Sequence, residues 1–175
     1  MFTFTVYDLL AKNVPSRADH PAIVDGDDEI TYGELSRRVD ALASWLHANG
    51  VARGDRVGVH IRKSVEEVVA TFAVARIGAV FVNVNHQRTA PQLKYIVDDC
   101  GIRVLLTDRR KARLIEKDGW LDELDAVVVV GGGIEHANAI AWSDLPDEGT
   151  PPSPVAISVD LGALLYTSGS TGKPK

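Results

Sequence analysis

A run of glycines, hydroxyl side chains and lysines near the end of the chain has the residue types best suited to chemistry. It reads Tyr-Thr-Ser-Gly-Ser-Thr-Gly-Lys-Pro-Lys over residues 166–175 and directly follows the apolar residues 163–165. Glycines let backbone N–H groups approach an anion closely, hydroxyls add short donors, and lysine adds positive charge. A buried strand that ends in such a loop predicts a phosphate-binding site. On composition alone, a linker or a disordered tail is the alternative.

The nucleotide-triphosphatase motif G-x-x-x-x-G-K-[ST] does not fit this segment. Counting back five positions from Gly172 gives Thr167 instead of glycine, and Pro174 stands where that motif needs Ser or Thr. The segment resembles instead the phosphate loop of the AMP-forming adenylating enzymes, which include acyl-CoA synthetases, peptide-synthetase adenylation domains and luciferases. Residues 166–175 match that family's pattern, an aromatic residue followed by Thr-Ser-Gly-[Ser/Thr]-Thr-Gly-x-Pro-Lys, at every fixed position.

Shorter motifs carry the same resemblance along the rest of the chain, in the family's order and spacing. They are Thr-Tyr-Gly-Glu-Leu at 31–35, Gly-Asp-Arg-Val at 54–57, the helix-to-strand segment 75–82, the helix 89–100 and Thr-Asp at 107–108. The chain departs from the family at Asn83 and His86, where prolines are frequent. This departure concerns the stiffness of one turn and leaves the phosphate loop unaffected.

The resemblance implies that the loop binds ATP. Its hydroxyls and N–H groups would face the β- and γ-phosphates, its glycines would permit close approach, and Lys173 would supply charge, while Lys175 would add charge or anchor the loop. No residue of the chain is predicted to be catalytic or to bind a metal. The predicted cofactor-binding residues are Thr167, Ser168, Gly169, Ser170, Thr171, Gly172 and Lys173.

The reaction that the resemblance implies has two steps. A carboxylate attacks the α-phosphorus of ATP to give an acyl-adenylate and pyrophosphate, and a thiol, commonly that of CoA, then displaces AMP to form a thioester. ATP, Mg and CoA would serve the parent enzyme, with a carboxylic acid as its substrate. Residues 80–85 and 160–166 resemble the acyl-CoA branch more than the amino-acid adenylation domains, which stay as an alternative. The acyl group and the accepting thiol cannot be read from these residues.

The family's members are several times longer than 175 residues, and their adenine, magnesium and acyl sites follow the phosphate loop. We therefore expect an N-terminal fragment of an ATP-dependent acyl-CoA ligase that is inactive on its own. We also expect self-association, because the helix that normally covers the neighbouring strands is missing. A non-catalytic α/β module that acts by binding or self-association is the alternative.

The composition suits a cytoplasmic enzyme. The chain is 45% hydrophobic and 25% charged, and its net charge is -5, with acids and bases interleaved and no basic block. These features argue against nucleic acid as the main ligand. Apolar runs such as 126–130 are too short to span a membrane, and residues 1–15 carry no export signal. Cys100 is the only cysteine, which excludes an internal disulfide and a cysteine-rich metal site.

Helical and strand patterns alternate along the chain, which predicts an α/β fold with a mostly parallel sheet covered by helices on both faces. We expect a body over 1–145, a proline-rich connector over 146–159, and a strand with the phosphate loop over 160–175. The predicted helices are 4–13, 31–50, 64–78 with a stripe of Val65, Val68, Val69 and Phe72, 89–101, and a short one around Leu114 and Ile115. The predicted strands are the hairpin 21–24 with 29–32, and 56–61, 79–82, 103–107, 126–130 and 160–166.

Several polar residues and glycines have simple scaffold explanations. Capping, helix-stop and strand-start positions account for Tyr32, Glu34, Asp55 and Gly78, and Asp98 and Asp99 fit the end of a helix. His60 and His86 are expected to be packed or solvated, since the sequence names no partner for them. Residues 131–133, three glycines, lack the dinucleotide-binding spacing and predict a turn.

Overall fold

The computed structural model describes residues 4–26, 28–153 and 156–167. The chain forms two compact units, and both are assembled from separate stretches of sequence. The helical unit comprises the described residues within 1–54, 63–79 and 145–162. The sheet unit comprises those within 55–62, 80–144 and 163–175.

The helical unit begins with two short helices and a hairpin. Helix α1 spans Asp8–Ala11 and α2 spans Val14–Arg17, so the single opening helix predicted over 4–13 is wrong. Pro15 lies in the first turn of α2, where its missing N–H would have no helical partner in any case. The hairpin is confirmed, with β1 at Pro21–Asp25 antiparallel to β2 at Asp28–Thr31.

Helix α3 covers Tyr32–Ala48 and packs against helix α4 at Val65–Arg76. The predicted cap of α3 is present, because the Thr31 hydroxyl accepts a hydrogen bond from the backbone N–H of Glu34 at 3.2 Å. The Glu34 carboxylate also accepts hydrogen bonds from Arg37 and Arg38, which lower its pKa to about 2. One face of α3 is buried, and it consists of Leu35, Val39, Leu42 and Leu46, spaced as on an amphipathic helix.

The buried face of α4 differs from the predicted stripe. Of the four predicted residues only Val69 is fully buried, while Val65, Val68 and Phe72 are partly exposed. The face that is buried continues instead through Ala70, Ala73 and Val74. Helix α4 is apolar on most sides, so its pattern of apolar residues does not show which side packs inward. Larger apolar side chains such as Phe72 do not mark the buried face.

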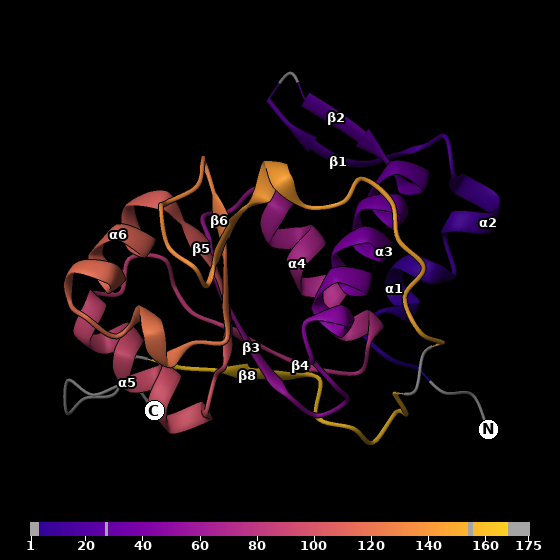
Figure 1. Ribbon diagram of the computed structural model, residues 1–175. Helices are drawn as coiled ribbons and strands as arrows, with labels where there is room; N and C mark the ends of the chain where they lie inside the picture. Colours follow the sequence, from indigo (N-terminus) through magenta and orange to yellow (C-terminus); the bar gives the residue numbers. More distant parts are fainter. Residues whose placement is uncertain (1–3, 27, 154–155, 168–175) are drawn as a thin grey trace. The chain divides into compact units, whose positions relative to one another are not determined.

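The sheet unit is built on six strands that all run parallel, in the order β7-β6-β5-β3-β4-β8 (Figure 1). An α/β fold with a parallel sheet flanked by helices is thus confirmed. The short strand β7 and two 3-10 turns, at Leu121–Glu123 and Trp142–Asp144, were not predicted. The strands are β3 at Arg56–His60, β4 at Val80–Asn83, β5 at Val104–Asp108, β6 at Ala126–Val130, β7 at Ala139–Ala141 and β8 at Ala163–Leu165.

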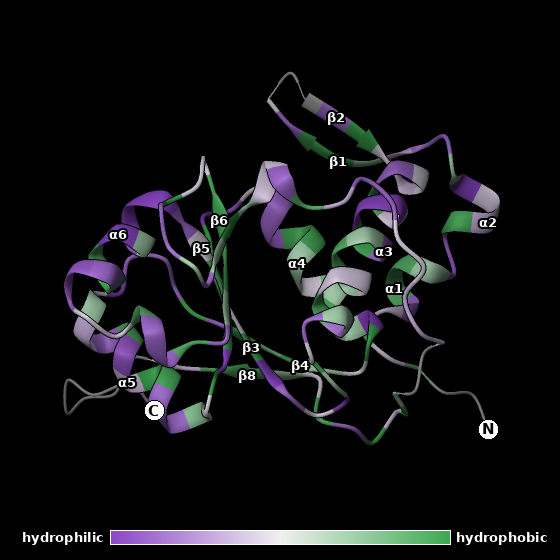
Figure 2. Ribbon diagram, viewed as in Figure 1, coloured by the Kyte–Doolittle hydropathy of each residue, from purple (hydrophilic) through white to green (hydrophobic). Residues whose placement is uncertain are grey.

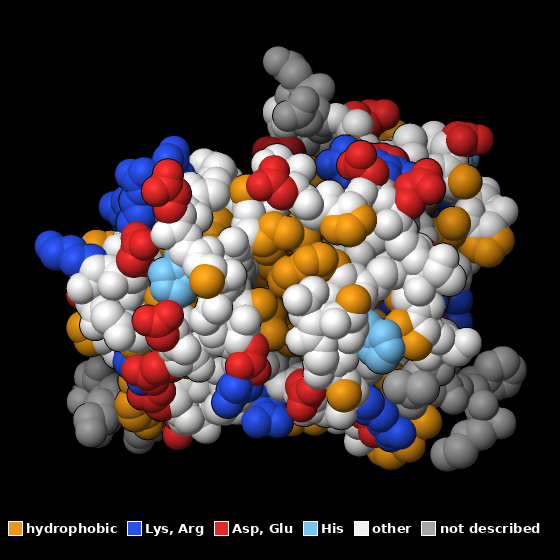
Figure 3. Space-filling view, viewed as in Figure 1, with side chains coloured by type: hydrophobic (Ala, Val, Ile, Leu, Met, Phe, Trp, Pro, Cys, Tyr) orange, Lys and Arg blue, Asp and Glu red, His pale blue; other side chains and the backbone are white. Residues whose placement is uncertain are grey.

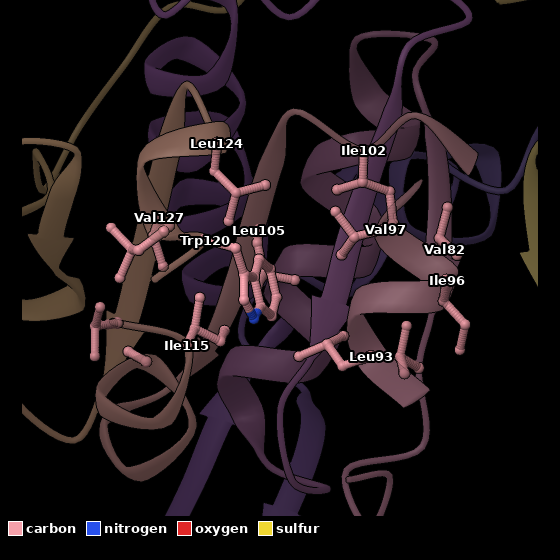
Figure 4. Close-up of a cluster of buried hydrophobic side chains, with 14 residues drawn as sticks. Val82, Leu93, Ile96, Val97, Ile102, Leu105, Ile115, Trp120, Leu124 and Val127 are labelled. Atoms are coloured by element: carbon pink, nitrogen blue, oxygen red, sulfur yellow. The ribbon is translucent and has the colours of Figure 1, made fainter. Parts of the chain in front are cut away.

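The core of the sheet unit consists of apolar side chains from the strands, from α5 at Ala90–Cys100 and from α6 at Arg109–Lys117 (Figure 4). Leu105 and Val127 contribute from the strands, and Leu93 and Ile115 contribute from the two helices. Trp120, which is 5% exposed, also belongs to this cluster. Burial of each large aliphatic side chain contributes roughly 1.5–3 kcal/mol, so this cluster fixes both helices to the sheet.

Helix α5 begins and ends where the sequence predicts. Thr89 and Gln92 form a reciprocal capping box at its start. Gly101 ends it with φ at 62°, the left-handed conformation that favours glycine. Arg56 donates a hydrogen bond from Nε to the carbonyl of Cys100 at 2.8 Å and so satisfies one of the last carbonyls of α5.

The connecting segment before β8 contains no helix or strand over 145–153 and 156–162, and three arginines of the helical unit hold it. Arg37 and Arg76 donate to its carbonyls at Asp147 and Pro152, and Arg53 pairs with Asp160 at 2.7 Å. The division of the chain at 146–159 stays a prediction. None of the helices within the described ranges is both long and apolar enough to cross a bilayer.

Candidate phosphate-binding site

The carboxyl ends of the strands in the sheet unit meet at one edge, because all six strands are parallel. In open α/β sheets, ligands bind beyond this edge. His60 ends β3, Asn83 ends β4, Asp108 ends β5, and Tyr166 with Thr167 follows β8. The start of the predicted phosphate loop therefore lies at the carboxyl edge of the sheet, where α/β proteins bind their ligands.

Strand β8 fixes the base of that loop. It pairs with β4 through the register Phe81 with Ala163, Val82 with Leu164 and Asn83 with Leu165. Leu164 and Tyr166 pack against the core of the sheet unit, whereas Leu165, between them, is 69% exposed. This alternation is that of a half-buried strand, and it continues to the first residue of the phosphate motif.

Tyr166 is also tied to the end of helix α5 through its hydroxyl. The phenol donates a hydrogen bond to Oδ2 of Asp99, and it lies 3.2 Å from the Sγ of Cys100. Burial, the hydrogen bond to Asp99 and the neighbouring thiol all raise the pKa of Tyr166. The phenol therefore stays protonated at neutral pH and keeps donating to the carboxylate. The residue before the loop is thus anchored by a packed ring and by a charge-assisted hydrogen bond.

A second polar group lies buried at the same edge. His60 is 0% exposed, and its Nδ1 lies 3.4 Å from the hydroxyl of Thr107, which donates to the backbone carbonyl of His60 at 3.2 Å. Burial, and after it the charge of Lys111, lower the pKa of His60, to about 4 overall. His60 is thus a neutral, packed side chain at physiological pH, and the structure confirms the packed alternative that the sequence left open.

Of the predicted ATP-binding residues, the structure describes Thr167 alone, and its side chain is exposed just beyond β8. Ser168, Gly169, Ser170, Thr171, Gly172 and Lys173, like Lys175, lie outside the described residues, so their role stays a prediction. Among the described residues, no group of three or more His, Cys, Asp and Glu side chains could hold a metal ion.

Sequence reasoning missed the anchor of the loop. It explained Asp99 as a helix-end residue and noted Cys100 only as the single cysteine, although both contact Tyr166. Asp99 and Tyr166 are 67 positions apart. The spacing of neighbouring residues cannot predict this contact. The two side chains meet only because β8 pairs with β4 and α5 packs on the sheet.

The sequence model of a family described as "AMP-binding enzyme" matches residues 10–175. The chain belongs to this family. It corresponds to the N-terminal AMP-binding part of the adenylate-forming enzymes, among which are acyl-CoA ligases and peptide-synthetase adenylation domains.

Individual members of this AMP-binding family resemble the chain along nearly its whole length. A medium/long-chain-fatty-acid–CoA/3-oxocholest-4-en-26-oate–CoA ligase of Mycolicibacterium smegmatis is 30% identical over 97% of the chain. Gramicidin S synthase 2 of Brevibacillus brevis is 30% identical over 98% of it. The crystal structure of the anthranilate CoA ligase AuaEII with anthranoyl-AMP matches 100% of the chain with a TM-score of 0.88 and 30% identity.

The chain spans only part of each of these relatives. It covers 32% of the mycobacterial ligase, 34% of the anthranilate CoA ligase and 4% of the gramicidin synthase. The relatives are AMP-forming ligases, and the chain corresponds to about a third of the two CoA ligases.

Proposed function

We propose that the loop after β8 binds the β- and γ-phosphates of ATP through Thr167, Ser168, Gly169, Ser170, Thr171, Gly172 and Lys173. One observation carries this proposal: the ten-residue signature begins at the carboxyl edge of a parallel sheet, on a residue fixed by Asp99. A loop that holds a polyphosphate needs a rigid base and adaptable donors. Tyr166 supplies the base, and the glycines and hydroxyls that follow supply the donors.

The donor chemistry of the loop suits the triphosphate of ATP. Backbone N–H groups beside Gly169 and Gly172 can approach phosphate oxygens without side-chain obstruction, and the hydroxyls donate at short range. Lys173 places a point charge against the terminal phosphates. ATP supplies the α-phosphorus at which the carboxylate is activated. Mg and CoA belong to the proposed reaction, but we assign them no residue of this chain.

For the complete enzyme we propose an ATP-dependent, AMP-forming acid–thiol ligase that acts on a carboxylic acid. The two-thirds of the CoA ligases that the chain does not cover would supply the remaining groups, so we expect no adenylation by this chain alone. We favour the acyl-CoA branch because residues 80–85 and 160–166 resemble it. Amino-acid adenylation is the second candidate, because a gramicidin synthase is as similar in sequence as a CoA ligase.

The phosphate-binding proposal is tested by isothermal titration of the chain with ATP and Mg. We expect millimolar or tighter binding, which a Thr171→Ala, Lys173→Ala double variant should abolish. The matched control is Thr150→Ala with Lys63→Ala, which removes one Thr and one exposed Lys outside the loop. If the unmodified chain does not bind ATP, or if the control loses binding equally, the loop is not a working site and the non-catalytic module is the better interpretation.

The substrate class is tested by carboxylate-dependent ATP–pyrophosphate exchange in the complete enzyme, because the groups that would select the acid lie in the part of the ligase length that this chain does not cover. Exchange with fatty or aromatic acids is the expected result, whereas exchange with amino acids alone would contradict the acyl branch. A cytoplasmic location and self-association both stay predictions. A clean monomer by light scattering at high concentration would contradict self-association.

A further inference from the structure

The outward side of helix α6 carries a concentration of positive charge. The sequence suggested interleaved charges, yet residues 109–117 contain five bases and a single acid. Lys111 is one of the five, but it is 5% exposed and donates from Nζ to the carbonyl of Arg88 at 2.6 Å. Ala112 and Ile115 are buried beside it. The other four cations, Arg109, Arg110, Arg113 and Lys117, are exposed.

These four side chains share one face of the helix. At about 100° of rotation per residue, Arg109, Arg113, Lys117 and Arg110 follow one another within an arc of roughly 100°. No acid lies inside this arc. The acid of the helix, Glu116, borders the arc beside Arg109. At the other border, next to Arg110, lies Leu114, which is 38% exposed.

The positive charge of this face is not neutralised within the described part of the chain. Several other cations of the chain are paired. Arg53, Lys94 and Arg103 each form ion pairs with carboxylates, with nitrogen–oxygen distances of 2.6–3.0 Å. None of the four exposed cations of α6 forms an ion pair with a described residue. Four adjacent, unpaired cations repel one another, so this face is suited to an external anion.

The shape of the face indicates an extended anionic partner. The four cations and Leu114 line a shallow depression to which only α6 contributes, so it cannot enclose a small ligand. Figure 3 shows Lys and Arg side chains gathered over α6, and Figure 2 shows this helix as predominantly hydrophilic. A broad surface of negative charge can contact all four cations at once.

We propose that the outer face of α6, formed by Arg109, Arg110, Arg113, Leu114 and Lys117, binds the surface of a bilayer that contains anionic phospholipid. Basic side chains attract anionic headgroups, and a flanking leucine can enter the boundary between headgroups and acyl chains. Nucleic acid fits less well, because this face offers no aromatic side chain for stacking and the chain has a net charge of -5. An acidic protein surface would match the positive charge of this face but would offer Leu114 no apolar environment.

The test is co-sedimentation of the chain with vesicles of phosphatidylcholine containing about 30% phosphatidylserine, compared with vesicles of pure phosphatidylcholine. We expect binding to the anionic vesicles only, and binding that weakens as salt is raised. An Arg113→Gln, Lys117→Gln variant should bind roughly 25-fold more weakly, because each of the two basic residues near an anionic surface contributes about a factor of five. Leu114→Ser should weaken binding at constant charge.

The matched control is Arg17→Gln with Arg62→Gln, which removes two exposed cations from elsewhere in the chain. This control should bind within twofold of the unmodified chain. Circular dichroism of each variant confirms that a loss of binding is not a loss of fold. Equal losses in the control and the α6 variant, or no binding to anionic vesicles, would overturn the proposal. Binding of duplex DNA or polyglutamate through α6 without vesicle binding would also overturn it.

Discussion

The burial of His60 predicts that the chain loses stability in mild acid. His60 ends strand β3 with no exposed surface, and its Nε2 has no hydrogen-bond partner among the described residues. Burial, Lys111 and His86 lower its pKa, whereas Asp108 and a backbone hydrogen bond at Asn85 act in the opposite direction, and the net result is a pKa of about 4. Protonating this ring in the folded state would bury a charge in the sheet unit that Asp108 and Asn85 compensate only in part.

The sign and size of the effect follow from the two pKa values. An unfolded histidine has a pKa of about 6.5, so between pH 6.5 and pH 4 the unfolded chain binds more protons than the folded one. Stability is therefore complete above this window and falls as the pH falls through it. Between about pH 7.5 and pH 5.0, this one residue should reduce the free energy of unfolding by about 2 kcal/mol.

Urea denaturation at both pH values measures this loss, and His60→Leu should remove it. The substitution does not leave the Thr107 hydroxyl without an acceptor, because this hydroxyl can still donate to the backbone carbonyl of residue 60. Other ionisable groups also respond to pH, so the informative quantity is the difference between the unmodified chain and the variant. His20→Leu, at an exposed position, is the control and should retain the full loss. If His60→Leu loses as much stability as the unmodified chain, the reasoning is wrong.

Three further substitutions test the packing and the anchor of the loop. Gly58→Ala places a Cβ 2.7 Å from Cδ1 of the buried Leu105, so it should cost roughly 1–3 kcal/mol in urea denaturation; an unchanged midpoint would refute the close contact. Tyr166→Phe removes the hydrogen bond to Asp99 and should cost about 1 kcal/mol and speed hydrogen exchange in β8, whereas unaltered exchange would mean that the phenol is not an anchor. Thr89→Ala breaks the capping box of α5 and should cost about 1 kcal/mol, seen as a Tm roughly 2–4 °C lower, and an unchanged Tm would contradict it.

The elements that sequence reasoning predicted well are those with local signals at their ends. Thr89 and Gln92 start α5 and Gly101 ends it, and all three act through groups within one helical turn. The strands of the parallel sheet were found because they are continuous apolar runs, such as residues 126–130. Local information of this kind also predicts the phosphate loop, whose signature is contiguous, although residues 168–175 lie outside the described part of the chain.

The features that could not be predicted depend on distant parts of the chain. Which face of α4 is buried is decided by its neighbours, since Val69 and Val74 are no more apolar than the partly exposed Val65. The short strand β7 has only three residues, too few for a periodic pattern. The contact between Asp99 and Tyr166 likewise exists only once the sheet has formed.

The edge position of β8 has a consequence for the order in which the chain folds. In the described sheet β8 contacts β4 alone, and the two strands are separated in sequence by β5, β6 and β7. Closing so long a loop costs entropy that only a nearly finished sheet can offset, so β8 should dock last. Tyr166, at the base of the predicted phosphate loop, would then gain its fixed position only after the other described strands have paired.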